Sequence, residues 1–190
     1  PPYIKRCYEM KQGRLTAIDN DNPSELMKIA EQYQPIPLRH IEKNQNQAME
    51  IILENASIYL EHAEIVKHVN WHIKPKEQWT LIGHNGSGKS TLLNGILGFL
   101  PIAHGGTITR NWYQNIQSPP VPLTILDEIK KKIRFVSDSL QIHYTFNDTV
   151  FNIIFAGFDG NIGVYREKTS EEEQKIQELI YQLNLGHLTN

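Results

Sequence analysis

The sequence is short of cysteine and of long apolar runs, and each shortage excludes a class of protein. Cys7 is the only cysteine in 190 residues, so an intrachain disulfide and a paired-cysteine metal site are both excluded. No apolar run approaches the ~18–20 residues that a membrane-spanning helix requires. Acidic side chains nearly balance basic ones, and the net charge of −2 gives no general attraction to nucleic acid or to an anionic membrane. A reducing cytosol fits these shortages.

Other absences concern the start of the chain and its metal-binding residues. The first residues mix charges with short apolar pieces, which is not the pattern of a signal peptide. An initiator methionine is missing, so we expect the chain to be an excerpt of a longer protein. The eight histidines are scattered and show no HExxH pattern. No basic patch with interleaved aromatic residues indicates a nucleic-acid partner.

The stretch Gly83–Ser90 has the spacing G-x-x-x-x-G-K-S, which is that of a phosphate-binding loop. An apolar run, Trp79–Ile82, precedes it and an amphipathic segment, Thr91–Leu100, follows it, so the motif has the strand–loop–helix context that it requires. Its glycines allow successive N–H groups to turn towards an anion, and the helix adds its positive N-terminal end. Lys89 is placed to reach the β- and γ-phosphates of a nucleotide, and Ser90 is placed to bind Mg²⁺. The predicted nucleotide-binding residues are Gly83, His84, Asn85, Gly86, Ser87, Gly88, Lys89, Ser90 and Thr91.

Hydrophobic periodicity predicts an α/β fold around this loop. Residues 1–16 indicate two short strands joined by a turn at Lys11–Gly13, and Ser24 indicates the start of a short helix before a polar linker. Further strands are predicted over 51–59, 66–73, 79–82, 107–109 and 133–137, of which 79–82 and 133–137 are expected to be buried. Helices are predicted over 91–100, 127–133 and 148–157. Ser170 is expected to cap a last helix that begins with three glutamates, and Pro101 is expected to end the helix after the loop.

From Ile51 to Leu100 the pattern resembles the ATP-binding subunit of ABC transporters. The matching pieces are Leu53–Ser57, Val69–Trp71 and Gly83–Thr91, and the resemblance continues at Gly105–Ile108 and Ile133–Ser137. It implies a P-loop NTPase fold of the ABC type, with an antiparallel β-subdomain and the start of a helical subdomain. It also implies that the ligands are ATP and Mg²⁺.

Two later stretches, Phe155–Phe158 and Ile162–Glu167, resemble the tandem cytoplasmic ATPases that are grouped with molybdenum-transport and photorepair ABC proteins. The first residues, Pro1–Ile4 and Tyr8–Leu15, are similar to the closing strands of a preceding ABC domain. We therefore expect residues 1–16 to be the tail of a first ATPase domain and 17–48 to be a short helix and linker. Residues 49–190 would be the N-terminal part of a second ATPase domain.

The adenine-stacking position departs from the family pattern. The family stacks adenine on an aromatic residue early in the domain, and without a gap that position falls on Leu60, with Tyr59 one residue earlier. In a strand, an offset of one residue points the ring to the opposite face. Either the end of the strand bulges and Tyr59 stacks on adenine, or the stacking is weak.

A second departure concerns the residue that contacts Mg²⁺ and the attacking water. The family has a glutamine directly after the strand that corresponds to Ile133–Ser137, whereas this sequence has Asp138 there and Gln141 three residues later. Gln141 could take the role of the family's glutamine, or Asp138 could coordinate the metal through its carboxylate. The third alternative is that neither residue takes this role.

The segment Leu123–Glu128 mimics the apolar strand that carries the Mg²⁺-binding aspartate and the catalytic glutamate of ABC ATPases. In the family that strand follows a signature loop, and no LSGGQ-like run precedes residue 123. We therefore interpret Asp127 and Glu128 as the first turn of a charged helix, near its positive end. The signature loop, the acidic strand and the switch histidine would lie beyond Asn190, so the excerpt alone is expected to be inactive and marginally stable.

The resemblance implies that the full-length protein binds and hydrolyses ATP as the nucleotide-binding component of an ABC transporter, with molybdate-type import as the family-level candidate. Its partners would be a second ABC ATPase domain, in cis or in a dimer, and a membrane permease. It would lie in the cytoplasm or on the cytoplasmic face of the inner membrane. The alternative is a soluble tandem ATPase, or a non-hydrolysing ATP-binding switch, that works without a permease.

Overall fold

The structure is a computed structural model that describes residues 6–18, 46–137 and 148–188, and the chain divides into two units, 1–124 and 125–190. The predicted short helix after Ser24 and most of the linker that follows it lie outside the described residues, as do Asp138 and Gln141. Among the described residues, no helix is both long enough and apolar enough to cross a membrane.

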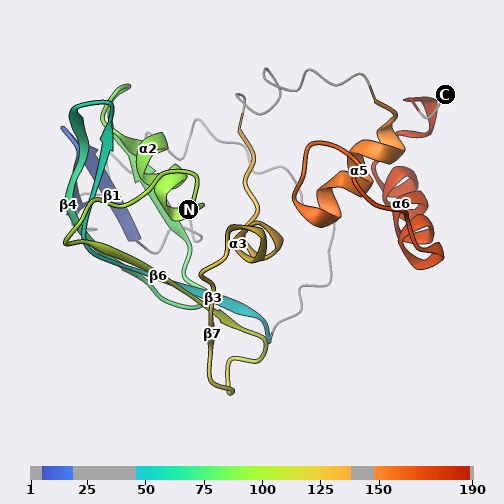
Figure 1. The fold of residues 1–190 in the computed structure, drawn as a ribbon, viewed down its shortest axis with the longest axis horizontal. Helices are drawn as coiled ribbons and strands as arrows, with labels where there is room; N and C mark the ends of the chain where they lie inside the picture. Colours follow the sequence, from blue (N-terminus) through green and yellow to red (C-terminus); the bar gives the residue numbers. More distant parts are fainter. Residues whose placement is uncertain (1–5, 19–45, 138–147, 189–190) are drawn as a thin grey trace. The chain divides into compact units, whose positions relative to one another are not determined.

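A four-stranded antiparallel sheet forms much of the first unit. Its strands lie in the order β4 (Ala63–Ile73), β3 (Ala48–Leu60), β6 (Thr107–Tyr113) and β7 (Val121–Pro122), as Figure 1 shows. Alternation along β3 and β4 buries one set of side chains, including Leu53, Ile58 and Val66. This sheet corresponds to the antiparallel β-subdomain that the family resemblance implies.

A smaller sheet carries the strand that leads into the phosphate loop. Strands β1 (Arg6–Lys11) and β2 (Arg14–Ile18) form the predicted hairpin, and β1 then pairs in parallel with β5 (Trp79–Ile82). The register places Tyr8 opposite Leu81 and Glu9 opposite Ile82. Strand β5 is half-buried along its whole length, so the prediction of a buried strand here is wrong.

Three aromatic rings connect the two sheets. Tyr8 comes from β1, Trp71 from β4 and Trp79 from β5. The Tyr8 and Trp79 ring centroids lie 4.8 Å apart, and the Trp71 and Trp79 rings meet edge to face at 5.3 Å. Offset and edge-to-face contacts of this kind are favourable beyond the apolar area that they bury. The cluster therefore fixes β5, and with it the entry to the phosphate loop, against the larger sheet.

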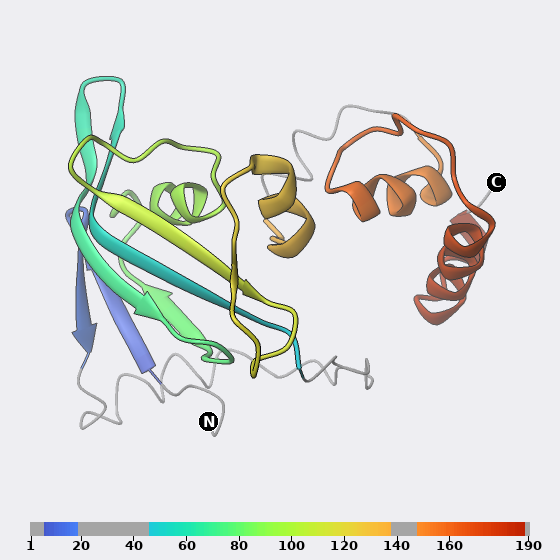
Figure 2. The ribbon, with the colours of Figure 1, turned by 60° about the horizontal axis from the view of Figure 1, so that its bottom comes forward.

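Helix α2 (Lys89–Ile96) follows the phosphate loop and lies over one face of the larger sheet (Figure 2). Its Leu92 and Ile96 side chains are buried, and Gly95 allows a close approach to β3, since a Cβ there would lie 2.5 Å from Ile58 Cδ1. The helix ends at Ile96, before the expected stop at Pro101. The Gly98 N–H donates to Gly95 O (3.0 Å) from a left-handed backbone conformation, which is a common way to end a helix.

The second unit is helical where it is described. It contains α3 (Leu126–Lys132), α5 (Val150–Asp159), α6 (Ser170–Gln182) and the short 3₁₀ turn η1 (Gly186–Leu188). Asp127 and Glu128 lie in the first turn of α3, as predicted. Phe155 of α5 packs with two buried isoleucines of α6 to form the core of this unit.

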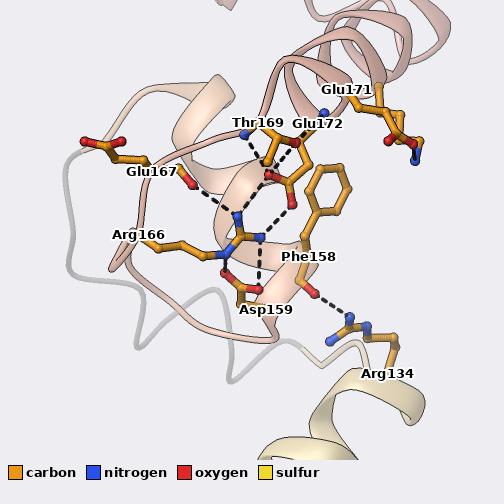
Figure 3. A network of polar contacts seen from close by, with 9 residues as sticks. Arg134, Phe158, Asp159, Arg166, Glu167, Thr169, Glu171 and Glu172 are labelled. Carbon is orange, nitrogen blue, oxygen red and sulfur yellow. Dashed lines mark hydrogen bonds and ion pairs between the residues drawn. The ribbon is translucent and has the colours of Figure 1, made fainter.

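An arginine joins the end of α5 to the start of α6 (Figure 3). The Arg166 guanidinium donates to both carboxylate oxygens of Asp159 (2.8 and 3.1 Å) and to both of Glu172 (2.9 and 2.6 Å). Glu172 also takes part in a capping box with Thr169, so the N-cap of α6 is Thr169. The prediction of Ser170 as the cap is therefore wrong by one residue, because the hydroxyl of Thr169 is the one spaced to accept from the third helical N–H.

The segment Ile133–Ser137 was predicted as a buried strand, and this prediction is wrong. The segment is irregular, and the Val136 side chain is 98% exposed. A strand needs a neighbour to satisfy its backbone groups, and no described strand pairs with this segment.

Candidate functional site

The predicted phosphate loop connects β5 to α2 in the first unit and forms a tight glycine-rich turn. Its glycines Gly83, Gly86 and Gly88 have φ values of 147°, 78° and 99°, which L side chains rarely adopt. The Ser87 N–H donates to His84 O (3.2 Å) and closes the turn. The tip of the loop is exposed, whereas Ser87 and Gly88 are buried.

Two of the loop's glycines lie against neighbouring backbone. A Cβ at Gly83 would lie 2.2 Å from Met10 O, and one at Gly88 would lie 3.1 Å from Ile65 O. A Cβ at Gly86 would meet nothing within 4 Å. One side of the loop is therefore packed against β1 and β4, and the tip at Gly86 is left open.

The N-terminus of α2 is open to an anion. Gly88 is its N-cap, no side chain accepts a hydrogen bond there, and the first turn has no acidic residue. The described helix α6 is the opposite case, since Thr169 and Glu172 already occupy its first N–H groups. The unpaired N–H groups and the positive dipole end of a helix such as α2 favour a phosphate.

Lys89 lies within reach of the loop that it follows. Its Nζ donates to Gly83 O (2.7 Å) and His84 O (2.8 Å), and it lies 3.4 Å from Ser87 Oγ. These partners are neutral, so the described contacts leave the ammonium charge without a counter-ion. A nucleotide phosphate at the loop would supply that opposite charge.

The last two residues of the loop motif lie at the start of α2. Ser90 is the second residue of α2 and is exposed, and Thr91 follows it half-buried. A hydroxyl oxygen suits Mg²⁺, whose other ligands would be phosphate oxygens and water. Within the described residues, no group of three histidine, cysteine, aspartate or glutamate side chains could hold a metal ion.

Strand β3 is irregular where it reaches Tyr59. Its register with β4 shifts between Ile58 and Tyr59, and Tyr59 pairs with Glu64 at the end of the strand. The side chains of Tyr59 and Leu60 are 50% and 40% exposed. Residue 65, next to Glu64, is the one whose carbonyl approaches Gly88. The residue that pairs with Tyr59 is therefore the direct neighbour, on β4, of a residue that lies against the phosphate loop.

Arg110 was not identified by sequence reasoning, although it contacts the same helix as the loop. Its Nε donates to Ile96 O (2.6 Å) and its Nη2 to Gly95 O (2.7 Å), so it satisfies carbonyls at the C-terminus of α2. Burial lowers the pKa of Arg110 from its ordinary value. The cation complements the negative end of the helix dipole. The sequence gives only a weak signal for this contact, because Arg110 lies within β6 and its nearer helix partner, Ile96, is 14 residues earlier in the chain.

Comparison with known proteins gives consistent matches. Residues 66–190 match the family model described as ABC transporter. The ABC transporter ATP-binding protein ModF of Escherichia coli (strain K12) is 31% identical over 139 residues, which are 73% of this chain and 27% of ModF. The putative HMP/thiamine import ATP-binding protein YkoD of Bacillus subtilis (strain 168) is 28% identical over 159 residues, which are 83% of this chain and 26% of YkoD. This chain therefore spans about a quarter of the length of either relative.

A solved structure of an ATP-binding cassette of an ABC transporter is also similar. It is 22% identical, with a TM-score of 0.49, and the match covers 73% of this chain and 55% of that one.

Proposed function

This chain belongs to the ABC transporter family, which confirms the predicted P-loop fold of the ABC type, and we propose that it binds MgATP through Gly83–Thr91. The observation that carries this proposal is the open N-terminus of α2 directly after the loop, with the Lys89 ammonium beside it. Backbone donors, a helix dipole and one cation lie together there, and this combination supports the binding of a phosphate chain.

Each loop residue has a chemical role in this proposal. The loop N–H groups bind phosphate oxygens, Lys89 neutralises charge on the β- and γ-phosphates, and Ser90 contributes its hydroxyl to Mg²⁺. When bound, Mg²⁺ would neutralise phosphate charge during phosphoryl transfer. We further propose that the full-length protein hydrolyses ATP, with Lys89 as a catalytic residue and Gln141 as the water-orienting group.

Tyr59 is proposed as the residue that stacks on adenine. The register shift after Ile58 supports this assignment, because an irregular strand end can turn the ring towards the other face. Half of the Tyr59 side chain is exposed and is therefore accessible to a base. Leu60 is the weaker candidate for adenine stacking, since it has no aromatic ring.

The place of the chain in a longer protein is also a proposal. On the family resemblance, residues 1–16 would be the tail of a preceding ABC ATPase domain, although their hairpin pairs with β5 in the first unit of this structure. Residues 17–48 would be a helix and linker, and 49–190 the first part of a second ATPase domain. The partners would then be a second ATP-binding domain and a membrane permease, and this protein would lie in the cytoplasm or on the cytoplasmic face of the membrane. Molybdate-type import is the proposed cargo class, on the resemblance to molybdenum-transport ATPases.

A soluble tandem ATPase or a non-hydrolysing switch is the second candidate. The full-length sequence distinguishes an ATP-hydrolysing protein from a non-hydrolysing switch. An intact signature loop and Asp–Glu pair after Asn190 indicates hydrolysis, whereas degraded versions of both indicate a switch.

Titration calorimetry tests the nucleotide proposal. The chain should bind ATP more tightly with Mg²⁺ than with EDTA, and Ser90→Ala should remove most of that difference while ATP itself still binds. Ser118→Ala is the matched control, since Ser118 is an exposed serine outside the loop. If MgATP binds no more tightly than adenosine alone, the phosphate loop is not the nucleotide site.

A further inference from the structure

The turn of the N-terminal hairpin lies against the phosphate loop. Parallel pairing brings Glu9 opposite Ile82, and the next residues continue that contact, since Met10 O faces Gly83. The Met10 side chain is 1% exposed, and its Cε lies 3.1 Å from the position that a Cβ on Gly88 would take. The hairpin is thus packed against Gly83 and Gly88 of the phosphate loop.

Gly13, in the turn of this hairpin, uses both of its backbone groups in these contacts. Its N–H donates to Ser87 O (3.2 Å), and its carbonyl accepts from the Lys67 N–H (2.8 Å). Gly13 therefore links β4 to the phosphate loop through two hydrogen bonds. Its φ is 80°, which L side chains rarely adopt, and a Cβ would lie 2.1 Å from Ile65 O. A side chain at this position would therefore be strained and would also clash with the backbone of Ile65.

The bond from Gly13 has a consequence for the donors of the loop. A trans peptide is planar, and its C=O and N–H point in opposite directions. No cis peptide occurs among the described residues. Because Ser87 O points to the hairpin, the N–H of Gly88 in the same peptide points away from it. Gly88 precedes Lys89, so this N–H belongs with the donors at the start of α2.

We propose that Gly13 is a positioning residue of the nucleotide site, which fixes the Ser87–Gly88 peptide so that the Gly88 N–H faces the bound phosphates. This inference rests on the proposed function, since it assumes that the loop binds the phosphates of ATP. Gly13 makes no contact with nucleotide in this account. It acts through Ser87, and β4 anchors it through Lys67.

The experiment compares Gly13→Ala with Gly105→Ala in the full chain. Gly105 is the matched control because its φ is 90°, yet a Cβ there would meet nothing within 4 Å. Binding of MgATP and of tripolyphosphate is measured well below the melting temperature of each variant. Gly13→Ala should weaken both ligands about tenfold, because a misdirected N–H loses a hydrogen bond to a charged group. Gly105→Ala should bind both as the unsubstituted chain does.

Amide NMR spectra without ligand provide the second measurement. Gly13→Ala should shift the Ser87, Gly88 and Lys89 resonances, and Gly105→Ala should leave them in place. If Gly13→Ala does not fold, Met10→Leu serves instead. It conserves volume and removes the Cε atom that lies 3.1 Å from where a Gly88 Cβ would be, and it should shift the same resonances. A merely structural role would lower the melting temperature without changing these resonances or the affinities.

The outcomes separate this inference from the proposed function. If the unsubstituted chain does not bind MgATP, the proposed function is wrong, and the ligand-free spectra still decide whether Gly13 positions the loop. Unchanged loop resonances in the folded variants, or equal affinities for tripolyphosphate, would overturn the inference while leaving nucleotide binding intact.

Discussion

The ammonium nitrogen of Lys89 lies 2.7 Å from the carbonyl oxygen of Gly83, on the inner side of the loop that precedes it. In this arrangement the cation is bonded to neutral oxygens, so the contact it could make with a phosphate is the stronger one. The Lys89 ammonium therefore lies beside the loop that we propose as the phosphate site.

Removing that cation should weaken nucleotide binding. Lys89→Met keeps the length of the side chain and loses the charge, and MgATP affinity should fall about 10- to 100-fold, since a charged hydrogen bond contributes about 1.5–3 kcal/mol. Titration calorimetry gives the affinity. Lys131→Met, at an exposed lysine of the second unit, should have no effect. Equal affinities for the two variants would show that the phosphates bind elsewhere.

The two candidates for adenine stacking can be separated by their ligands. Tyr59→Ala should weaken MgATP about tenfold, because stacking of a base on an aromatic ring contributes about 1–3 kcal/mol. It should leave tripolyphosphate binding unchanged, since that ligand has no base. Leu60→Ala is the adjacent control and should change neither. If Leu60→Ala weakens MgATP and Tyr59→Ala does not, the strand is in the ungapped family register.

Arg110 should stabilise the first unit through helix α2. Arg110→Met leaves the half-buried carbonyls of Gly95 and Ile96 without their side-chain donor, and the free energy of unfolding should fall by about 1–3 kcal/mol. Arg110→Lys should recover only part of this loss. An ammonium keeps the charge but lacks the forked guanidinium that reaches both carbonyl oxygens. Urea unfolding followed by circular dichroism measures the difference. If Arg110→Met leaves the free energy of unfolding unchanged, water satisfies the carbonyls at the end of the helix.

The junction of α5 and α6 should weaken in acid. Hydrogen bonds from Arg166 and Thr169 lower the pKa of Glu172 to about 2, from an ordinary value of 4.5. A group with a lowered pKa in the folded state stabilises that state above its unfolded pKa, and the stabilisation is lost as pH falls from about 4.5 to about 2. Helix content followed by far-UV circular dichroism over this range should decline.

The control for this prediction is the neighbouring glutamate. Glu172→Gln should remove most of the acid dependence. Glu171→Gln should keep it, because Glu171 pairs with Lys175 on the exposed face of α6 and takes no part in the Arg166 network. Identical acid profiles for the two variants would show that the Arg166 network does not stabilise the junction.

Local features of this protein could be predicted from the sequence, and pairings between distant segments could not. The strand–loop–helix around Gly83–Thr91 has a fixed spacing and turn chemistry, and the strands and helices beside it follow from periodicity. The hairpin at the start of the chain was predicted as well. Its partner, β5, lies about 70 residues later, and no pattern in either strand encodes which neighbour it pairs with.

The errors also have physical causes. Ile133–Ser137 has the composition of a strand, but composition does not form a strand without a neighbour to pair with. The cap of α6 was placed at Ser170 because serine is a favoured cap, whereas the reciprocal bonds between Thr169 and Glu172 select the residue before it. Gly13 was predicted as a turn glycine, and its contact with Ser87 depends on the tertiary arrangement alone.

The cluster of Tyr8, Trp71 and Trp79 makes the phosphate loop observable without a label. Trp79 is the first residue of the strand that enters the loop, and its indole meets Trp71 edge to face at 5.3 Å. Two indoles this close couple their electronic transitions, so a small rotation of β5 alters the near-ultraviolet spectrum and the emission of the pair. The chain thus carries an intrinsic optical reporter four residues before the first glycine of its loop.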